Sequence, residues 1–350
     1  MIDWITVPCM PCTHSSAIKA GMVIALTIDG EVEWQTNKRL AVEGSFSSTV
    51  QIRSSSQGIP GTCIEVSGNP SKFLQGHNLF GSNDLTGLVS GMMRAIFAKI
   101  PQLTPSQTDL DMIDRGSYLL SRVDIAEVWA LANRRQVRTA ISTLAAFTNL
   151  THRPGKASIT GETTCYWGKN SRRWALKAYC KGDEIEKKGH RLPPELMDIS
   201  GLEQYADTAL RIELVLRGME LKDTEMELHL AANWGDNTAQ EVYDSYLSRL
   251  KISEATMMKT EVLNELPPRL QLAYQSWLAG HDLRAMMPRK TFYRYRKELM
   301  GHGIDISNVH HTRKESNVIP LGLVLHARPV GVPNWAIGTP LYFEPRSRAA

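Results

Sequence analysis

Apolar and polar residues alternate along several stretches of the chain, with the period of two that is typical of β-strands having one buried face. The alternation is most regular in residues 121–131, 163–182 and 208–218. Shorter stretches of the same kind, separated by Gly, Asn and Ser, occupy residues 22–29, 31–34, 47–54 and 62–68. The stretch at 163–182 predicts a hairpin that turns at residues 168–170. Together these patterns predict an antiparallel sheet.

Two other stretches repeat their apolar residues every three or four positions, as amphipathic helices do. They are residues 82–100, with Ser82 or Asn83 as the N-cap, and residues 132–147. Strands and helices mix along the chain without regular βαβ alternation. The predicted fold class is therefore α+β, with an antiparallel sheet flanked by helices.

The pattern changes from about residue 267 onward. Helices are predicted at 267–280, 281–287 and 288–303, and a strand is predicted at 317–330. A helix, a short helix, a basic aromatic helix and a strand in this order are typical of a winged helix-turn-helix. We therefore expect two domains, residues 1–260 and residues 261–350, of which the second is a small, winged-helix-like DNA-binding domain.

The composition is that of a soluble globular protein, with 350 residues, 42% hydrophobic and 22% charged. No run of about 18 apolar residues appears, so no membrane span is expected. The first residues lack the basic region of a signal peptide, which favours a cytoplasmic protein. The net charge of +4 is uneven, because residues 281–350 carry +6 and the remainder carries −2. This excess favours a nucleic-acid surface at the C-terminal end.

The five cysteines lie at positions 9, 12, 63, 165 and 180, which is no zinc-binding spacing. Cys9 and Cys12 form an isolated Cys-x-x-Cys pair, a weak signal for redox or metal chemistry. We expect ordinary reduced thiols, as in most cytoplasmic proteins.

One face of the predicted sheet carries residues with chemical potential. In the stretch "RRWALKAYCK", residues 172–181, the side chains of Lys177, Tyr179 and Lys181 share a face. The carboxylates that the same alternation places on the polar faces of other strands are Glu65, Asp124 and Glu213. A solvated sheet face explains each of these residues taken alone. Carboxylates on neighbouring strands repel one another, however, unless cations or a metal ion neutralise them.

These residue types fit one reaction. Carboxylates, together with a histidine such as His77, can hold Mg²⁺ or Mn²⁺. Such an ion can polarise a phosphodiester, and a tyrosine can attack phosphorus. Lys177 and Lys181 would favour the phenolate of Tyr179 or hold phosphates beside it. The predicted chemistry is metal-assisted transesterification of DNA, which leaves a phosphotyrosyl link and a free 3′-OH.

Six strings of residues resemble the gene II replication initiators of filamentous bacteriophages, the inoviruses. They are "SKFLQGHNLFGSNDL" (71–85), "SRVD" (121–124), "RRWALKAYCK" (172–181), "LRIEL" (210–214), "MPRKTFYRY" (287–295) and "NVIPL" (317–321). Their order and spacing match that family over nearly the whole chain. The N-terminal part looks most like the branch that infects Pseudomonas.

The resemblance implies that residues 1–260 form a relaxase-like rolling-circle nuclease domain. Such initiators bind the double-stranded replicative form at the plus-strand origin, nick the plus strand, and later cut and rejoin the displaced single strand. The family's nucleophile corresponds to Tyr179. The implied partners are phage DNA in both forms, a host helicase and a host DNA polymerase, in the host bacterial cytoplasm and with no membrane. Many rolling-circle nucleases use a His-x-His pair, which this sequence lacks, so His77 is the predicted imidazole ligand.

Basic residues are the predicted DNA contacts, because Lys and Arg bind phosphates and Arg can read guanine in the major groove. With one tyrosine among them, they are Arg122, Arg172, Arg173, Arg211, Arg289, Lys290, Tyr293, Arg294, Arg296 and Lys297. Phe292 and Leu299 are expected to pack inward from the C-terminal basic helix. Two alternatives stay open. One is a non-catalytic origin-binding or regulatory DNA-binding protein, and the other is a metal-dependent nuclease that uses water while Tyr179 stacks on a base.

Overall fold

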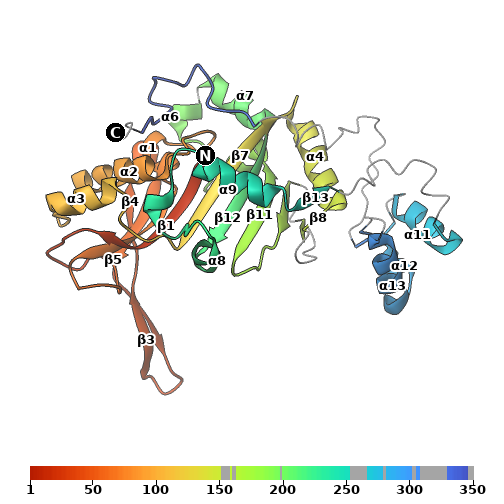
Figure 1. Ribbon diagram of the computed structural model, residues 1–350, viewed down its shortest axis with the longest axis horizontal. Helices are drawn as coiled ribbons and strands as arrows, with labels where there is room; N and C mark the ends of the chain where they lie inside the picture. The colour runs from red at the N-terminus through yellow and green to blue at the C-terminus, as the bar shows by residue number, and fades with distance from the viewer. Residues whose placement is uncertain are drawn as a thin grey trace.

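The structure is a computed structural model, and it describes residues 1–150, 158–159, 163–197, 199–252, 266–278, 281–301, 305–307 and 329–345. Within this part of the chain, nine strands form one antiparallel sheet (Figure 1). In spatial order they are β4 (Leu40–Glu43), β5 (Thr49–Ser54), β6 (Cys63–Gly68), β1 (Ile2–Pro11), β7 (Arg122–Ala130), β12 (Ala209–Arg217), β11 (Trp174–Cys180), β10 (Thr164–Trp167) and β9 (Ser158–Ile159). The predicted α+β class with an antiparallel sheet is confirmed.

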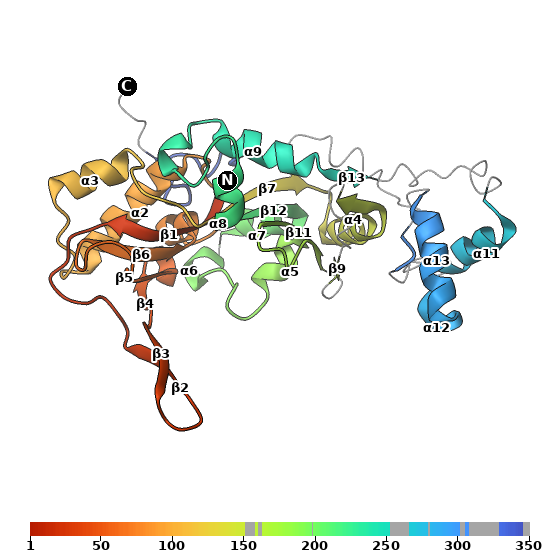
Figure 2. The same cartoon turned by 60° about the horizontal axis from the view of Figure 1, so that its bottom comes forward.

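Helices pack on both faces of this sheet. Those around the sheet are α1 (Pro70–Gln75), α2 (Leu85–Lys99), α3 (Gln107–Asp114), α4 (Arg134–Phe147), α5 (Lys181–Ile185), α6 (Pro194–Met197), α7 (Ser200–Thr208), α8 (Gly218–Asp223) and α9 (Thr238–Leu247). Figure 2 shows α2, α3 and α9 on one side of the sheet, and α5 and α6 on the other. Short 3₁₀ turns lie at Ser45–Ser47 and Ala231–Asn233.

The main core lies on the α2 side of the sheet. There the apolar alternate residues of β7, β11 and β12, such as Ile125, Leu176 and Ile212, are buried with Met92 of α2 and Ile141 of α4. Burial of such side chains contributes roughly 1.5–3 kcal/mol each, which is the main force holding the sheet to its helices. The helix α2 begins after Asp84, whose side chain accepts a hydrogen bond from the Gly87 N–H at 2.8 Å. The N-cap is therefore Asp84, and the prediction of Ser82 or Asn83 is wrong by one or two residues.

The central strand β1 was missed by the sequence pattern. Its apolar run is broken by Pro8 and Pro11, and proline usually argues against a strand inside a sheet. The register of β1 against β6 shifts between Val7 and Met10, so a bulge accommodates Pro8. The sulfur of Cys9, on the same strand, is bonded to that of Cys63 on β6, with Cα atoms 5.3 Å apart. The expectation of five reduced thiols is thus wrong for this pair.

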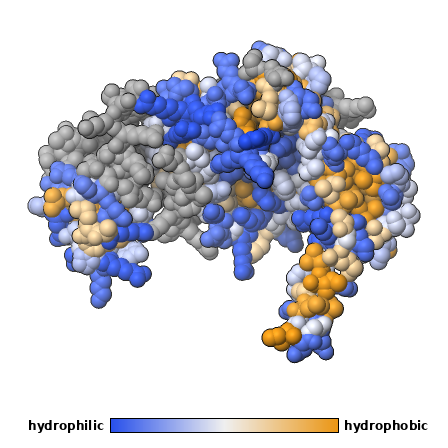
Figure 3. Space-filling model, turned by 180° about the vertical axis from the view of Figure 1, so that it is seen from behind, coloured by the Kyte–Doolittle hydropathy of each residue, from blue (hydrophilic) through white to orange (hydrophobic). Residues whose placement is uncertain are grey.

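A hairpin of β2 (Met22–Leu26) and β3 (Val32–Asn37) projects from the sheet (Figures 1 and 3). Its side chains stay exposed although many are apolar, and Ile24, Leu26 and Trp34 are each at least half exposed. A second small sheet pairs β8 (Thr148–Leu150) with β13 (Leu250–Ile252). Among the helices in the described ranges, none is long and apolar enough to cross a membrane.

Three further helices, α11 (Pro268–Leu278), α12 (Leu283–Met286) and α13 (Arg289–Met300), form a unit with its own apolar cluster. Trp277, Phe292 and Leu299 are buried in it, which confirms the predicted inward positions of the last two. The predicted strand at 317–330 lies outside the described residues except for its last two, so the winged-helix arrangement stays a prediction.

The end of the described chain returns to the sheet. The Val330 N–H donates to the Val128 carbonyl at 2.7 Å, and the Phe343 N–H donates to the Gln75 side chain at 3.0 Å. Residues 329–345 therefore pack on the first predicted domain, whereas the sequence had assigned them to the second. In the sequence, the helical unit lies between the strands of the sheet and a segment that packs against them.

Candidate functional site

The register of the sheet brings most of the predicted catalytic residues onto one face. Tyr179 of β11 pairs with Arg211 of β12, and Lys177 pairs with Glu213. Asp124 of β7 pairs with Val215, so it lies one row further along the same face. The period-two prediction for these side chains is therefore correct. This face lies opposite the main core.

Tyr179 is not on a wet surface, however, since it is only 3% exposed. The Lys177 ammonium lies 4.0 Å from the centroid of its ring, and the Lys181 ammonium lies 5.8 Å away. Burial raises the pKa of the Tyr179 phenol well above its usual value, and the charge of Glu184 adds to the effect. The phenol is thus neutral at pH 7 in this structure. The two cations contact the ring, and the predicted favouring of a phenolate is not seen here.

Arg211 is fully buried beside Tyr179 and makes a network with the start of the chain. Its guanidinium donates to the Asp3 carboxylate at 2.6 Å and to the Asn78 carbonyl at 2.7 Å. Asp3 also accepts hydrogen bonds from Asn69 and Asn78. Burial acts to raise the pKa of Asp3, but Arg211 and Lys181 outweigh it and the pKa is lowered. Arg211 is 0% exposed and already paired, so it is not an open DNA-contacting surface in this structure, and its contact with DNA stays a prediction.

Lys181 begins α5 rather than continuing β11, and it is almost completely buried. Its ammonium donates to the Asn78 side chain at 2.9 Å and to Glu184 at 2.6 Å. Burial lowers the pKa of Lys181. The loop that contains Asn78 and the first turn of α5 therefore cover this part of the face, and the sequence did not predict this cover.

Glu184 and Asp3 are the charged residues of this site that the sequence reading missed. One oxygen of Glu184 binds Lys181, and the other lies 3.9 Å from the Lys177 ammonium. Burial acts to raise the pKa of Glu184, but Lys181 and Lys177 outweigh it and hold the pKa at about 2. Glu184 is three residues after Lys181, which is the spacing of a helical ion pair. That spacing in "KGDE" was the available signal.

Asp124 and Glu213 are the predicted metal ligands that come together. Glu213 lies 3.7 Å from the Lys177 ammonium, and Asp124 accepts two hydrogen bonds from Arg122, at 2.8 and 2.6 Å. Burial raises the pKa of Asp124 to about 8, with Glu213 adding to the rise and Arg122 opposing it. The Asp124 carboxyl therefore favours its protonated form at pH 7, mainly because it is buried.

Glu65 lies on the same face but away from this pair. Thr6 of β1 pairs with Ser67 of β6 and with Arg122 of β7, so these three residues form one row across the sheet. Glu65 lies two residues from this row in one direction along the strands, and Asp124 lies two residues from it in the other direction. At about 3.3 Å per residue, the two acids are about 13 Å apart along the strands alone. Glu65 binds Arg39 and Arg53 instead. It cannot share an ion with Asp124 in this arrangement.

His77 is buried against Phe80, with ring centroids 4.7 Å apart, and its ring accepts a hydrogen bond from the Leu79 N–H. Burial lowers the pKa of His77 to about 4, so the imidazole is neutral. These contacts suit a bracing residue of the loop. Within the described ranges, no group of three or more His, Cys, Asp or Glu side chains is arranged to hold a metal ion.

The predicted DNA-binding cations divide into paired and exposed ones. Arg122 binds Asp124, Arg173 binds Glu220 and Asp223, and Arg296 binds Asp305 through two hydrogen bonds. The predicted DNA-binding residues that are exposed to solvent are Arg172, Arg289, Lys290, Tyr293, Arg294 and Lys297. All of these except Arg172 lie on α13, and at 100° per residue they cover one arc of that helix. The exposed face of α13 is the best-formed cationic surface among the predicted residues.

Comparisons with known proteins identify the family. The family described as the N-terminal part of the replication-associated gene II protein matches residues 1–237, and the family described as its C-terminal part matches residues 261–345. The chain is 40% identical over 344 residues to the replication-associated protein of Enterobacteria phage I2-2, covering 95% of this chain and 96% of that protein. It is 24% identical to the replication-associated protein of Salmonella phage IKe, covering 74% and 71%, and 23% identical to that of Enterobacteria phage M13, covering 74% and 73%.

A rolling-circle replication initiator from Geobacillus stearothermophilus covers 74% of this chain and 88% of its own, with a TM-score of 0.32 and 12% identity. A similarity of that size supports no argument. The relatives named here do not include a Pseudomonas phage, so the predicted branch stays a prediction. The predicted resemblance to the gene II proteins is confirmed, and the chain belongs to the family of gene II replication-associated proteins.

Proposed function

We propose that this protein initiates rolling-circle replication of phage DNA by nicking the plus strand at its origin and later rejoining it, with Tyr179 as the nucleophile. Family membership supports a role in replication. The observation that carries the chemistry is the position of Tyr179, between two lysines and one row from Glu213 on the polar face. The site would act on double-stranded origin DNA and on the single plus strand, in the host cell.

The reaction is a balanced exchange of phosphodiester bonds. The Tyr179 oxygen forms a bond to phosphorus while the bond from phosphorus to the 3′ oxygen breaks. The phenol proton passes to a carboxylate, for which we propose Glu213, and from there to the departing 3′ oxygen, which leaves as a hydroxyl. Rejoining is the reverse, because a 3′-OH attacks the phosphotyrosyl phosphorus and the phenol is released. The lysine ammonium groups would bind the phosphate oxygens on which charge develops.

A divalent cation fits part of the predicted ligand set. Mg²⁺ in proteins is usually held by one or two carboxylates together with waters and substrate phosphates, and Asp124 and Glu213 supply two. Burial is the main cause of the raised pKa of Asp124, and Glu213 adds to it, so this carboxyl would have to lose its proton to bind the ion. When bound, Mg²⁺ or Mn²⁺ would polarise the phosphodiester. Glu65 and His77 would not take part, since Glu65 is far from the pair and His77 braces the loop.

The burial of Tyr179 is the observation that favours the alternative, a non-catalytic origin-binding protein. A DNA strand reaches the phenol only if α5 or the loop at Asn78 moves. Host helicase and polymerase as partners remain part of the proposal and follow from the family resemblance alone.

The test is to identify the residue left on DNA after cleavage of a single-stranded oligonucleotide that carries the origin sequence, in the presence of Mg²⁺. Mass spectrometry should find the 5′-phosphate on Tyr179, and Tyr179→Phe should form no adduct while still binding origin DNA. Tyr166→Phe is the matched control, because Tyr166 lies on β10 on the same face and is partly exposed. An adduct on Tyr166, or cleavage without any adduct, would refute the assignment.

A further inference from the structure

A cavity of about 640 Å³ opens at the edge of β7, where Val128 faces the polar side of the sheet and Glu127 and Trp129 face the main core. The first residue of β1, Ile2, pairs with Ile125 of β7. The residues of β7 after Ile125 therefore have no neighbouring strand on the β1 side, and this leaves room for the cavity. Met1 and the C-terminal segment take the vacant place: the Ala126 N–H donates to the Met1 carbonyl, and Val330 binds Val128. The cavity thus lies between β7, α7, α9 and residues 329–332.

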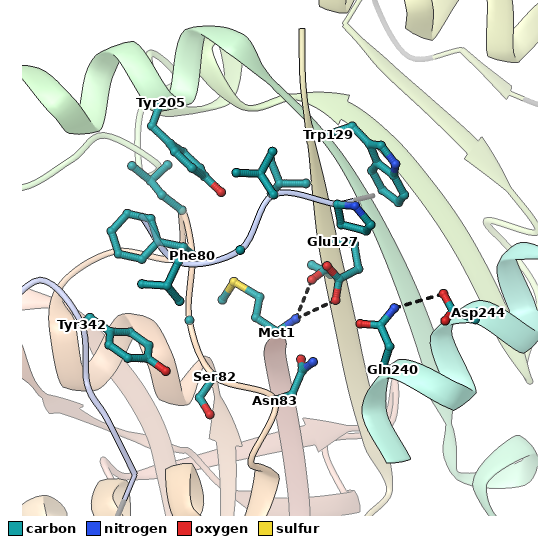
Figure 4. Close-up of a pocket in the computed structure, with 18 of the residues that line it drawn as sticks. Met1, Phe80, Ser82, Asn83, Glu127, Trp129, Tyr205, Gln240, Asp244 and Tyr342 are labelled. Carbon is teal, nitrogen blue, oxygen red and sulfur yellow. Dashed lines mark hydrogen bonds and ion pairs between the residues drawn. The ribbon is translucent and has the colours of Figure 1, made fainter. Parts of the chain in front are cut away.

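The walls of the cavity combine flat rings with hydrogen-bonding groups (Figure 4). Phe80, Tyr205 and Tyr342 stand on one side, and Trp129 and Gln240 stand on the other. The charged groups that line it are the carboxylates of Glu127 and Asp244 and the amine of Met1, which lies 3.3 Å from Glu127. Carboxylates outnumber the amine, so this lining disfavours a phosphate and favours a neutral group that donates hydrogen bonds.

Two buried polar atoms of the lining have no partner in the described structure. They are the hydroxyl of Tyr205 and the side-chain oxygen of Asn83. Figure 4 shows the Tyr205 hydroxyl directed into the cavity, and the Gln240 oxygen faces the same space while its amide donates to Asp244 at 3.0 Å. Buried polar groups in folded proteins nearly always have hydrogen-bond partners, so water or a group of a bound molecule is expected to supply the missing ones.

The cavity lies close to the proposed nucleophile. Val128, in its wall, pairs with Arg211, which in turn pairs with Tyr179. Two strand spacings separate Val128 from Tyr179, which is about 10 Å. A group of the DNA strand near the cut could therefore enter it.

We infer that this cavity binds one unstacked nucleobase of the single-stranded DNA, of the kind that carries an exocyclic amino group. The inference rests on the proposed function and adds a base-recognition site to it. Aromatic walls stack on any base, and each stack contributes roughly 1–3 kcal/mol. The acceptors Glu127, Asn83 and Gln240 suit the amino groups of cytosine and adenine, whereas thymine presents a carbonyl oxygen and a methyl group at the corresponding position. Guanine also carries an amino group, and the test ranks it with the other bases.

The experiment titrates the full chain with 2′-deoxycytidine, 2′-deoxyadenosine, 2′-deoxyguanosine and thymidine, and follows binding by ligand-observed NMR. At least one amino-bearing nucleoside should bind about fivefold more tightly than thymidine. Tyr205→Phe keeps the ring and removes only the hydroxyl, and Gln240→Ala removes the amide. Each variant should lower the affinity for that preferred nucleoside by about threefold to tenfold, the range for one lost hydrogen bond. Gln204→Ala, an exposed residue next to Tyr205 on α7, is the control and should change nothing.

Equal affinity for the four nucleosides, no binding, or variants that bind as well as the wild type would overturn the inference. Tyr179→Phe separates this result from the proposed function. It should lose the DNA adduct while binding the preferred nucleoside normally, because its phenol lies outside the cavity. If nicking proves not to use Tyr179 but the nucleoside preference and its variants behave as stated, the base site stands by itself.

Discussion

The ring of Tyr179 is surrounded by ionised groups that are themselves almost fully paired. Lys177 and Lys181 both interact with Glu184, and Arg211 forms an ion pair with Asp3. Removing one member of a buried pair leaves a charge without compensation, which commonly costs about 3–5 kcal/mol. At the residue scale, the site is therefore a set of coupled charges in which Glu184 holds the two lysines.

Glu184→Gln should destabilise the protein in a pH-dependent way. The pKa of Glu184 is held at about 2, below the ordinary value of 4.5. A lowered pKa contributes stability that is complete above pH 4.5 and is lost as the pH falls towards 2. The variant should therefore unfold about 3 kcal/mol more easily at pH 7, and the difference should shrink below pH 4.5. Urea unfolding between pH 3 and 7 measures it, with the exposed Glu195→Gln as control. A difference that does not vary with pH would contradict the assignment.

Alternation alone was enough to place Tyr179, Lys177, Glu213 and Asp124 on one face. The burial of Tyr179 and Arg211 could not be predicted, because the loop that covers them comes from about residue 78, far away in the sequence. Glu65 was grouped with the other acids because alternation fixes the face of a residue but not its position along the sheet. The register that separates them depends on strand pairing with β1, which the sequence pattern did not reveal.

At the scale of elements, α13 shows how apolar residues with a period of 3.6 give a helix one buried side and one exposed side. Phe292 and Leu299 face the apolar cluster, and the exposed cations lie on the other side. Arg296 is the exception, since it binds Asp305 and so stabilises the helical unit. Its raised pKa follows mainly from that hydrogen-bonded pair.

Replacing Arg289, Lys290, Arg294 and Lys297 together by Ala should weaken binding to duplex DNA and reduce its salt dependence. The slope of log affinity against log salt should fall by about 0.9 for each cation that contacts a phosphate. Fluorescence anisotropy over a salt series measures this slope. Arg115→Ala, an exposed change at the end of α3, is the control. Arg296→Ala should instead lower the unfolding temperature of the helical unit. An unchanged slope in the fourfold variant would exclude this face from phosphate contact.

The strands β7, β11 and β12 and the helices α2 and α4 could be predicted because their apolar periods are strong. The strand β1, the longest in the described part of the chain, could not, because Pro8 and Pro11 interrupt its pattern. The end of the chain illustrates a different limit. Residues 329–345 have no regular period, yet Ala336 and Leu341 pack with Leu79 and Phe80. Nothing local in that segment indicates that it returns to the sheet.

On the scale of the whole molecule, the sheet, the projecting hairpin and the C-terminal segment differ in how much apolar surface they bury. The apolar residues of β2 and β3 remain exposed, whereas residues 329–345 cover part of a buried cluster. Hydrophobic stabilisation follows the apolar area removed from water. The hairpin therefore adds little to the stability of the sheet, and the C-terminal segment adds much more.

Replacing residues 22–37 by a short Gly-Ser turn should leave the unfolding temperature nearly unchanged. The ends of the hairpin are already adjacent, since the Lys38 N–H donates to the Gly21 carbonyl at 2.9 Å. Truncation after residue 328 should lower the unfolding temperature clearly, because Leu79 and Phe80 lose their cover. Thermal unfolding followed by circular dichroism compares the two. A large loss on removing the hairpin, or none on truncation, would contradict this view.

The return of the chain to β7 has a consequence for how DNA would be bound. A domain at the free end of a protein can swing widely, but the unit of α11, α12 and α13 is anchored to the strands before residue 253 and again after residue 328. A single proteolytic cut on either side would leave it attached, and only two cuts would release it. A duplex bound by α13 is thereby kept within a limited distance of Tyr179.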